Sequence, residues 1–480
     1  MNTSRRALTI VAVLAVAWVA AAAYTKHKVG QSYRDEIAQL EKQLPMLHVS
    51  ELKQEGGLLS GTYSGVIHVG CAPVDGKPNA KSFAIAFQDR VQYGPLPGFK
   101  RFGAASVDSS FSLTDAAPQA LRTALAKIEP ARIHTDYGYG GSVSSSFILP
   151  AGELQMADPM AKVSLRWAET RMDMQGTRDK EHIVYTWALP DFNMGVGTGE
   201  GRSLMEMHIK NLMAKSDTHG RAGSWLRTGQ EESSLELFEI TSVAAGPDQP
   251  PINVVYNRLT GKTTATLQQD LMDVQFGYTL ASLQAGNAGP FAKLANVDMQ
   301  GKLSRLHGPS LEKAITALFS GLDGACAMDS GAAGAARPDV FVKGMVERLG
   351  ESLKGVMAQG PVFSIDKLAF DLDGKRGEMS MSASLQGVDM DALWKGGPQA
   401  KQVLQQGAKL QAKARVPLGW LTLAGGTPEQ VEQTVAGIVA QGMAERDGEF
   451  LKTEFSFAGG VAKINGVPMP MPQTQAQATQ

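Results

Sequence analysis

The stretch VSLRWA, residues 163–168, places an apolar side chain at every second position, at Val163, Leu165 and Trp167. The same alternation recurs at Ile183, Tyr185 and Trp187, and again at Met205, Met207 and Ile209. Successive side chains of a strand point to opposite faces, so strict alternation gives one buried and one wet face, which is typical of antiparallel sheets. Turn signals such as Gly140-Gly141 and Thr260-Gly261 separate these runs. Residues 46–307 are therefore predicted to be β-rich.

Beyond residue 307 the pattern mixes helices with strands. Apolar spacings of three and four residues predict helices over 311–319 and 341–356. Two strands, 363–372 and 379–385, are predicted on either side of a turn that begins at Asp373-Gly374.

A last helix is predicted to start at Thr427-Pro428-Glu429-Gln430. The threonine hydroxyl suits the N-cap, proline suits the first helical position, and glutamine three residues after the cap completes a capping box.

These patterns predict an α+β, β-rich fold. We expect large twisted antiparallel sheets, with helices concentrated in the C-terminal third and one N-terminal transmembrane helix in front. The predicted segments are a cytoplasmic tip (1–6), a signal anchor or transmembrane helix (7–24), a juxtamembrane helix (25–45), a β-rich region (46–307), a mixed α/β region (308–466) and a disordered tail (467–480).

The N-terminal apolar run ALTIVAVLAVAWVAAAAY starts at Ala7 and ends at Tyr24. At about 1.5 Å per residue it is just long enough to span a hydrocarbon core of about 30 Å. The run favours a retained membrane anchor, and the basic residues on both sides of it leave its orientation open. The alternative is a cleaved signal peptide, with a site among the alanines at 20–23, and a soluble periplasmic body. A lipoprotein would need a cysteine directly after the run, and the first is Cys71.

Composition restricts the partners. The formal net charge is −1, which provides no broad positive field for nucleic acid. The two cysteines, Cys71 and Cys326, could pair in an oxidising compartment or remain two separate thiols, and their spacing does not suggest a zinc site. The oligomeric state is left open.

No short motif reaches the specificity of a catalytic or cofactor signature. The stretch 195–200, GVGTGE, has Glu200 where a dinucleotide loop needs its third glycine, so a flexible turn is predicted there. Gly261-Lys262-Thr263 lacks the leading glycine of a phosphate loop, because position 256 is Tyr256, and is also predicted to be a turn. The sequence therefore predicts no catalytic, metal or cofactor-binding residues and no cofactor.

His134 and Asp136 share one face of a predicted strand and could orient one another for acid–base chemistry. Two polar residues on the wet side of a strand explain the same spacing. The remaining histidines are scattered singly along the chain. The apolar strand faces allow a different hypothesis, because a long sheet that curls without closing leaves an apolar groove for acyl chains or an unfolded partner. The simpler interpretation is that these faces make the core.

Three stretches together resemble a known family. They are the N-terminal apolar run followed by a lysine-containing helix, the motif GLLSG (57–61) with FQDRVQYGPLP (87–97), and the C-terminal order of helix, strand, Gly459-Gly460, strand and Ile464-Asn465-Gly466. The chain is similar to the YdgA/YihF-like family of Gram-negative envelope proteins, a domain of unknown function. The family pattern has histidine where this chain has Tyr93, so Tyr93-Gly94-Pro95 is interpreted as a rigid turn.

The resemblance implies an inner-membrane location with a periplasmic body, and it supplies no reaction and no site residue. Three functions are therefore expected. The first is a non-catalytic envelope protein that binds a lipid or protein partner. The second is a structural or assembly factor that acts through oligomerisation. The third is a hydrolase whose site is assembled only in the fold.

Overall fold

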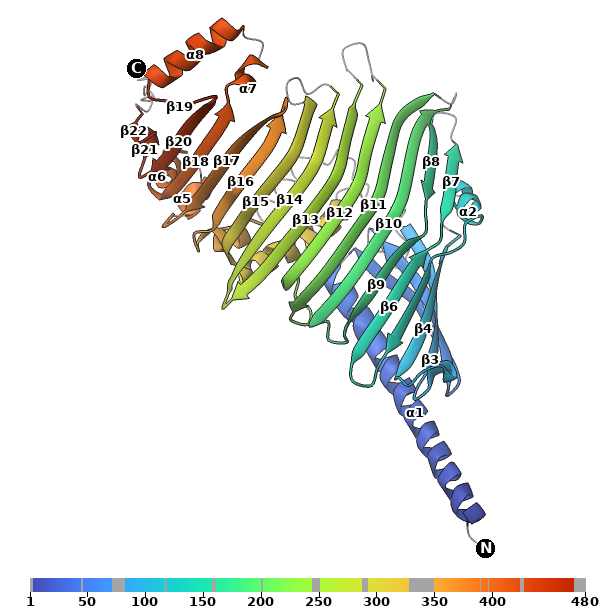
Figure 1. Cartoon of the computed structure of the whole chain (residues 1–480). Helices are drawn as coiled ribbons and strands as arrows, with labels where there is room; N and C mark the ends of the chain where they lie inside the picture. The colour runs from blue at the N-terminus through green and yellow to red at the C-terminus, as the bar shows by residue number, and fades with distance from the viewer. Residues whose placement is uncertain are drawn as a thin grey trace. The chain divides into compact units, whose positions relative to one another are not determined.

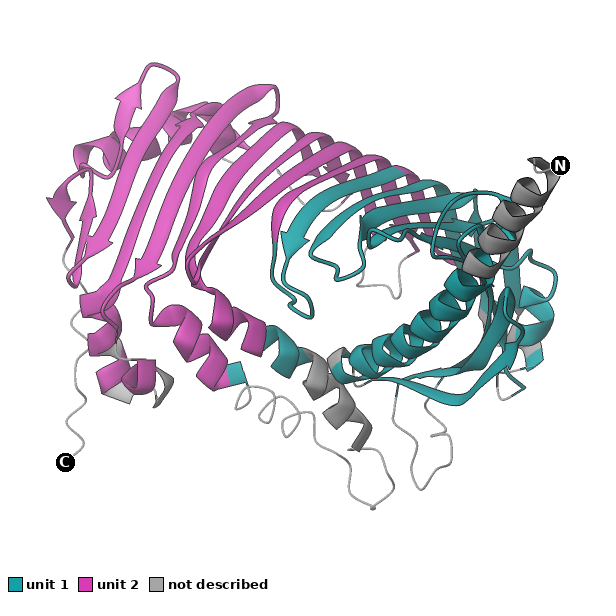
Figure 2. Cartoon of the chain, turned by 90° about the horizontal axis from the view of Figure 1, so that it is seen from below, with its two compact units in different colours: residues 1–202, 212–227, 314–349 teal, residues 203–211, 228–313, 350–480 magenta. Residues whose placement is uncertain are grey.

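The computed structural model describes residues 3–44, 46–70, 83–115, 117, 119–157, 161–199, 202–243, 251–286, 292–327, 349–388, 390–395, 397–423 and 427–469. The chain divides into two compact units (Figure 2). Unit 1 holds residues 1–202, 212–227 and 314–349, and unit 2 holds residues 203–211, 228–313 and 350–480.

Unit 1 combines the long N-terminal helix with an antiparallel sheet (Figure 1). Its helical elements are α1 (Thr3–Gln43), the short 3-10 helix η1 (Pro97–Phe99) and α2 (Gln119–Leu125). Its strands are β1 (Leu47–Gly56), β2 (Ser60–Val69), β3 (Phe83–Tyr93), β4 (Ala105–Leu113), β5 (Arg132–Tyr137), β6 (Ser142–Leu149), β7 (Gly152–Ala157), β8 (Ala161–Trp167), β9 (Thr170–Thr177) and β10 (His182–Thr198). Each pairs antiparallel with the next through β6, which then pairs with β9; β10 pairs with both β8 and β9, and β7 pairs with β8.

Helix α1 packs on one face of this sheet through aromatic side chains. Tyr33 stacks on Tyr63, with ring centroids 4.5 Å apart, and its hydroxyl donates to Asp89 Oδ2 at 2.6 Å. Beneath it lies a core cluster in which Val91 and Tyr93 are almost fully buried. Apolar burial therefore ties the helix to the sheet.

Unit 2 continues the antiparallel pattern. Strand β11 (Ser203–Gly220) contributes to both units. The strands that follow are β12 (Arg227–Ser242), β13 (Asn253–Gln268), β14 (Leu271–Ala285), β15 (Lys293–His307), β16 (Val362–Leu372), β17 (Lys375–Leu385), β18 (Ala408–Pro417), β19 (Glu445–Asp447), β20 (Phe450–Ala458), β21 (Val461–Ile464) and β22 (Val467–Pro468). Ladders join β12 through β18 in chain order, and β20 pairs with β18, β19 and β21.

Helices connect some of these strands. They are α3 (Gly308–Ala327), whose residues are divided between the units, α5 (Met390–Lys395), α6 (Gly397–Gly407), α7 (Gly419–Thr422) and α8 (Pro428–Ala440). Val431 and Val435 of α8 pack against Leu451 of β20 in a second core cluster.

Several local predictions are confirmed. Asp373 and Gly374 both have positive φ and form the turn between β16 and β17, as the Asp-Gly signal indicates. The capping box of α8 is present, because Thr427 accepts from the Gln430 backbone N–H and the Gln430 side chain accepts from the Thr427 N–H. Residues 94–96 form a bend, and the Gly94 N–H donates to the Ala104 carbonyl at 2.7 Å, which extends the pairing of β3 with β4.

Of two further predicted turns, one begins later than predicted and the other is wrong. Gly195 and Gly197 lie inside β10, where Gly195 pairs with Ser164, and the chain turns only after Thr198, whose N–H donates to the Arg202 carbonyl at 2.8 Å. Gly261 lies in the middle of β13. The ring of Tyr278 explains the second case. A Cβ at Gly261 would lie 2.7 Å from Tyr278 Cε1, so the glycine makes room for an aromatic ring rather than for a turn.

The predicted placement of the helices is wrong. The longest described helix is α1, α2 lies between strands of unit 1, and the C-terminal helices are short links in a sheet that continues through β20. The physical reason is that the period-two pattern persists to the end of the described chain, so the strands there pair with one another.

The predicted transmembrane helix over residues 7–24 is also corrected. Within the described part of the chain, no helix has the length and hydropathy needed to cross a bilayer. The side chains of residues 3–17 lie outside the description, and so do Cys71, the Cys326 side chain and most of the predicted tail, residues 470–480.

Candidate functional site: an apolar face in unit 2

One face of the unit 2 sheet carries apolar side chains in register across six strands, β14 to β18 and β20. The cross-strand pairs define three neighbouring rows, which we call the apolar rows. They are Val274–Leu303–Phe363–Ala383–Leu410–Phe457, Phe276–Gly301–Ile365–Met381–Ala412–Phe455 and Tyr278–Met299–Leu368–Met379–Ala414–Thr453. With strands about 4.8 Å apart, each row extends for roughly 24 Å, and the rows are roughly 7 Å apart.

The side chains of the apolar rows are only partly buried. Strand β16 shows the contrast, because Phe370 and Leu372 at its end are 7% and 3% exposed, whereas Phe363 and Ile365 on the same face are partly exposed. The buried end lies under α7, where the Trp420 ring stacks on Phe370 with centroids 4.8 Å apart. In the middle row Met381 is 39% exposed. Neither core cluster found among the described residues includes the apolar rows.

Glycines allow aromatic rings to lie flat against this face of the sheet. A Cβ at Gly301 would lie 2.6 Å from Cζ of Phe276, so the phenyl ring lies across the glycine of the neighbouring strand. The ring of Tyr278 crosses Gly261 on β13 in the same way. Aromatic rings that lie along a sheet cover the backbone without standing up toward a second layer. The flat rings and the other side chains of the apolar rows therefore form one continuous apolar surface.

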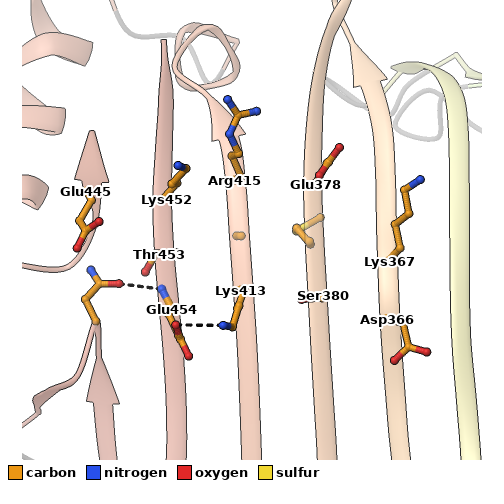
Figure 3. A pocket seen from close by; sticks show the side chains of 13 residues that line it. Asp366, Lys367, Glu378, Ser380, Lys413, Arg415, Glu445, Lys452, Thr453 and Glu454 are labelled. Atoms are coloured by element: carbon orange, nitrogen blue, oxygen red, sulfur yellow. Dashed lines mark hydrogen bonds and ion pairs between the residues drawn. The ribbon is translucent and has the colours of Figure 1, made fainter. Parts of the chain in front are cut away.

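The opposite face of the same strands is charged. Figure 3 shows acidic and basic side chains from β16, β17, β18 and β20 around a shallow hollow of about 500 Å³. Lys413 pairs with Glu454 at 3.3 Å, and both side chains are more than half exposed. Exposed pairs of this kind contribute at most about 1 kcal/mol each, so they identify a solvated face more than a source of stability.

Ion pairs stabilise the charged form of carboxylates on this face. A hydrogen bond from Lys367 lowers the pKa of Asp298, and the two groups are 2.6 Å apart. A hydrogen bond from Lys452 lowers the pKa of Asp447 in the same way. The sheet therefore has one face that must stay in water and one that water solvates poorly.

In unit 1 the structure brings His134 and Asp136 together. His134 Nε2 lies 2.9 Å from Asp136 Oδ2, and His134 Nδ1 lies 2.7 Å from Asp108 Oδ1. Arg101 also pairs with Asp136, at 2.7 Å. Since carboxylates contact both ring nitrogens, this arrangement leaves neither nitrogen to take a proton from the hydroxyl of Ser146, the cross-strand neighbour of His134.

The comparisons with known proteins identify the family. The model of a family described as "Bacterial protein of unknown function (DUF945)" matches residues 1–472. The chain belongs to the DUF945 family. No curated protein and no solved structure matches it.

The apolar rows were only partly visible in the sequence. The alternation at 379–385 indicates that Met379 and Met381 share a face, and the structure confirms strand β17 there. Which residues stand beside them depends on register, and a bulge in β16 between Ile365 and Leu368 shifts that register by one residue. The available signal was the recurrence of apolar alternation in the strands β14 to β18 and β20.

Proposed function

We propose that this DUF945 protein is a non-catalytic envelope protein that holds the acyl chains of lipids against the apolar rows of unit 2. One observation carries the proposal, namely that the three rows continue across six strands with partly exposed side chains. An apolar surface of this extent marks a binding site more often than an unused face.

The chemistry of the face favours acyl chains over a protein segment. Backbone N–H and C=O groups within the sheet bond to neighbouring strands, so the face offers dispersion and apolar contact without hydrogen-bond partners. An extended peptide laid on it would leave its own backbone polar groups unpaired, which costs free energy. An acyl chain has no such groups and gains about 0.8 kcal/mol for each methylene buried.

The dimensions also fit. An acyl chain occupies one leaflet of the hydrocarbon core, about 15 Å deep, and one row extends for roughly 24 Å. Flexible methionines at 299, 379 and 381 can adapt to chains of different shape. The charged face on the other side of the strands keeps the unit in water.

We further infer that the chain groups with the YdgA/YihF-like members of DUF945 and works in the periplasm. The order of the three stretches at the N-terminus, at 57–97 and at the C-terminus supports the grouping. Cell fractionation tests the location: we expect the chain with periplasmic or envelope material, and recovery with cytosolic proteins would contradict the inference.

Native mass spectrometry tests the lipid proposal. The purified chain is mixed with a bacterial lipid extract, and adducts with the mass of phospholipids are expected. Bare protein over a range of lipids would contradict it. Lipid-independent crosslinking to one envelope protein would favour the assembly function instead. The hydrolase function has less support, because both ring nitrogens of His134 contact carboxylates.

A further inference from the structure

Three potential metal ligands meet on the surface of unit 1, on β10 and β11. His182 Nε2 lies 2.9 Å from Asp217 Oδ1, and the rings of His182 and His219 stack with centroids 4.2 Å apart and planes 10° from parallel. One ligand atom from each residue lies within 4.8 Å of the other two. In a tetrahedral site with bonds of about 2.0–2.1 Å, ligand atoms are roughly 3.3 Å apart. The three residues are therefore close enough to bind one ion, and because the stacked rings hold their in-plane lone pairs nearly parallel, one imidazole has to turn about its side-chain bonds to bind it.

The sheet fixes this arrangement. The Gly220 N–H donates to the Glu181 carbonyl at 2.7 Å, which brings the end of β11 beside the start of β10 and so places His219 next to His182. Asp217 precedes His219 by two residues and is exposed on the same side of β11, while Thr218 between them is buried.

Hydrogen bonds from Arg227 to backbone carbonyls and to the Thr218 hydroxyl also hold these strands together. Its Nη1 donates to the Lys180 carbonyl at 2.9 Å, and its Nε and Nη2 donate to the hydroxyl and carbonyl of Thr218 at 2.9 and 3.0 Å. These bonds join the β9–β10 turn to β11 in the region of the two histidines. Ligands held on paired strands keep their spacing better than ligands on a loop.

We propose that His182, Asp217 and His219 bind a divalent transition-metal ion of the Zn²⁺ class. Two imidazoles and one carboxylate are ligands that Zn²⁺ accepts, and they leave a fourth position for water. Hard cations such as Mg²⁺ and Ca²⁺ prefer all-oxygen sets, so the two imidazoles select against them. All three side chains are within reach of solvent, which gives the ion an entry path.

Isothermal titration calorimetry of the full chain, with any purification tag removed, tests this proposal with ZnCl₂. One saturable site is expected, with MgCl₂ giving no signal. His219→Ala and Asp217→Asn should each weaken the Zn²⁺ affinity by at least about tenfold. If Zn²⁺ binding is absent, or if it survives His182→Ala and His219→Ala together, the proposal is wrong.

His134→Ala is the matched control. His134 also contacts two carboxylates, but Asp108 and Asp136 approach opposite ring nitrogens and cannot share an ion with the ring. We expect Zn²⁺ affinity unchanged in this variant. Far-ultraviolet circular dichroism of each variant checks that the sheet is intact. A loss of affinity in His134→Ala equal to that in His219→Ala would overturn the assignment.

Discussion

Replacing Tyr33 by phenylalanine removes one hydrogen bond between α1 and the sheet of unit 1. The Tyr33 hydroxyl donates to Asp89 Oδ2 at 2.6 Å, and Asp89 is 9% exposed. The substitution keeps the ring that stacks on Tyr63. It therefore isolates the hydrogen bond from the packing.

The cost follows from the burial of Asp89. A hydrogen bond to a charged group contributes about 1.5–3 kcal/mol. A cavity of about 760 Å³ borders Tyr33 and Asp89, so a water molecule can replace part of the hydrogen bonding that the Tyr33 hydroxyl gives to Asp89. We therefore expect the lower end, about 1.5 kcal/mol, which corresponds to roughly 3–6 °C in the melting temperature of a unit of this size.

Hydrogen exchange measures this loss unit by unit, which matters because a chain of two units need not unfold in one step. In Tyr33→Phe, protected amides of α1 and β3 should exchange roughly tenfold faster. Tyr24→Phe is the control, because Tyr24 lies on the same helix and is 62% exposed; it should change stability by less than about 0.5 kcal/mol. Equal exchange rates in the two variants would refute the reasoning.

Three further predictions concern local features. Burial raises the pKa of Tyr137 to about 12. The stabilisation from this neutral side chain is fully present below pH 10 and is lost as pH rises from about 10 through 12. Thermal melts at alkaline pH should therefore show unit 1 losing stability in that window, and a flat stability profile would contradict this. Thr427→Ala removes the α8 cap and should cost about 0.5–2 kcal/mol in urea unfolding, while an unchanged midpoint would show that the cap is dispensable. Gly377→Ala places a Cβ against the Trp420 ring and should cost about 1–3 kcal/mol of stability. Gly437→Ala, in open space within α8, should stabilise the protein by up to about 1 kcal/mol. A higher melting temperature for Gly377→Ala than for Gly437→Ala would contradict the packing around Trp420.

The strands could be predicted from the sequence because their signal is local. Alternation at 163–167 and 379–385 identifies β8 and β17, and the Asp373-Gly374 turn and the Thr427 cap depend on residues that are neighbours in the chain. The glycines misled the prediction for the same reason. Gly195 and Gly261 lie in local turn signals. Inside the sheet, however, position 261 needs a glycine because the ring of Tyr278 on the next strand leaves no room for a Cβ.

The sites could not be predicted, because they depend on pairing between distant strands. His182 and His219 are 37 positions apart in the sequence and stack only because β11 returns beside β10. The apolar rows likewise require a register across six strands, including a bulge in β16. Whether an apolar face is covered is also a tertiary property, and the contrast between Phe370 under Trp420 and the partly exposed Phe363 has no local signal.

A pair of neighbouring substitutions on β17 tests the central claim most directly. Met381 lies in the middle apolar row and Ser380 lines the hollow on the charged face, so Met381→Glu and Ser380→Glu add the same charge one residue apart on opposite faces. The measurement is phospholipid affinity by native mass spectrometry titration, with circular dichroism to confirm folding. A carboxylate in the row would have to be desolvated beneath an acyl chain, so we expect Met381→Glu to weaken binding at least tenfold and Ser380→Glu to bind as the unsubstituted chain does. Equal phospholipid affinity in the two variants would contradict binding at the apolar rows.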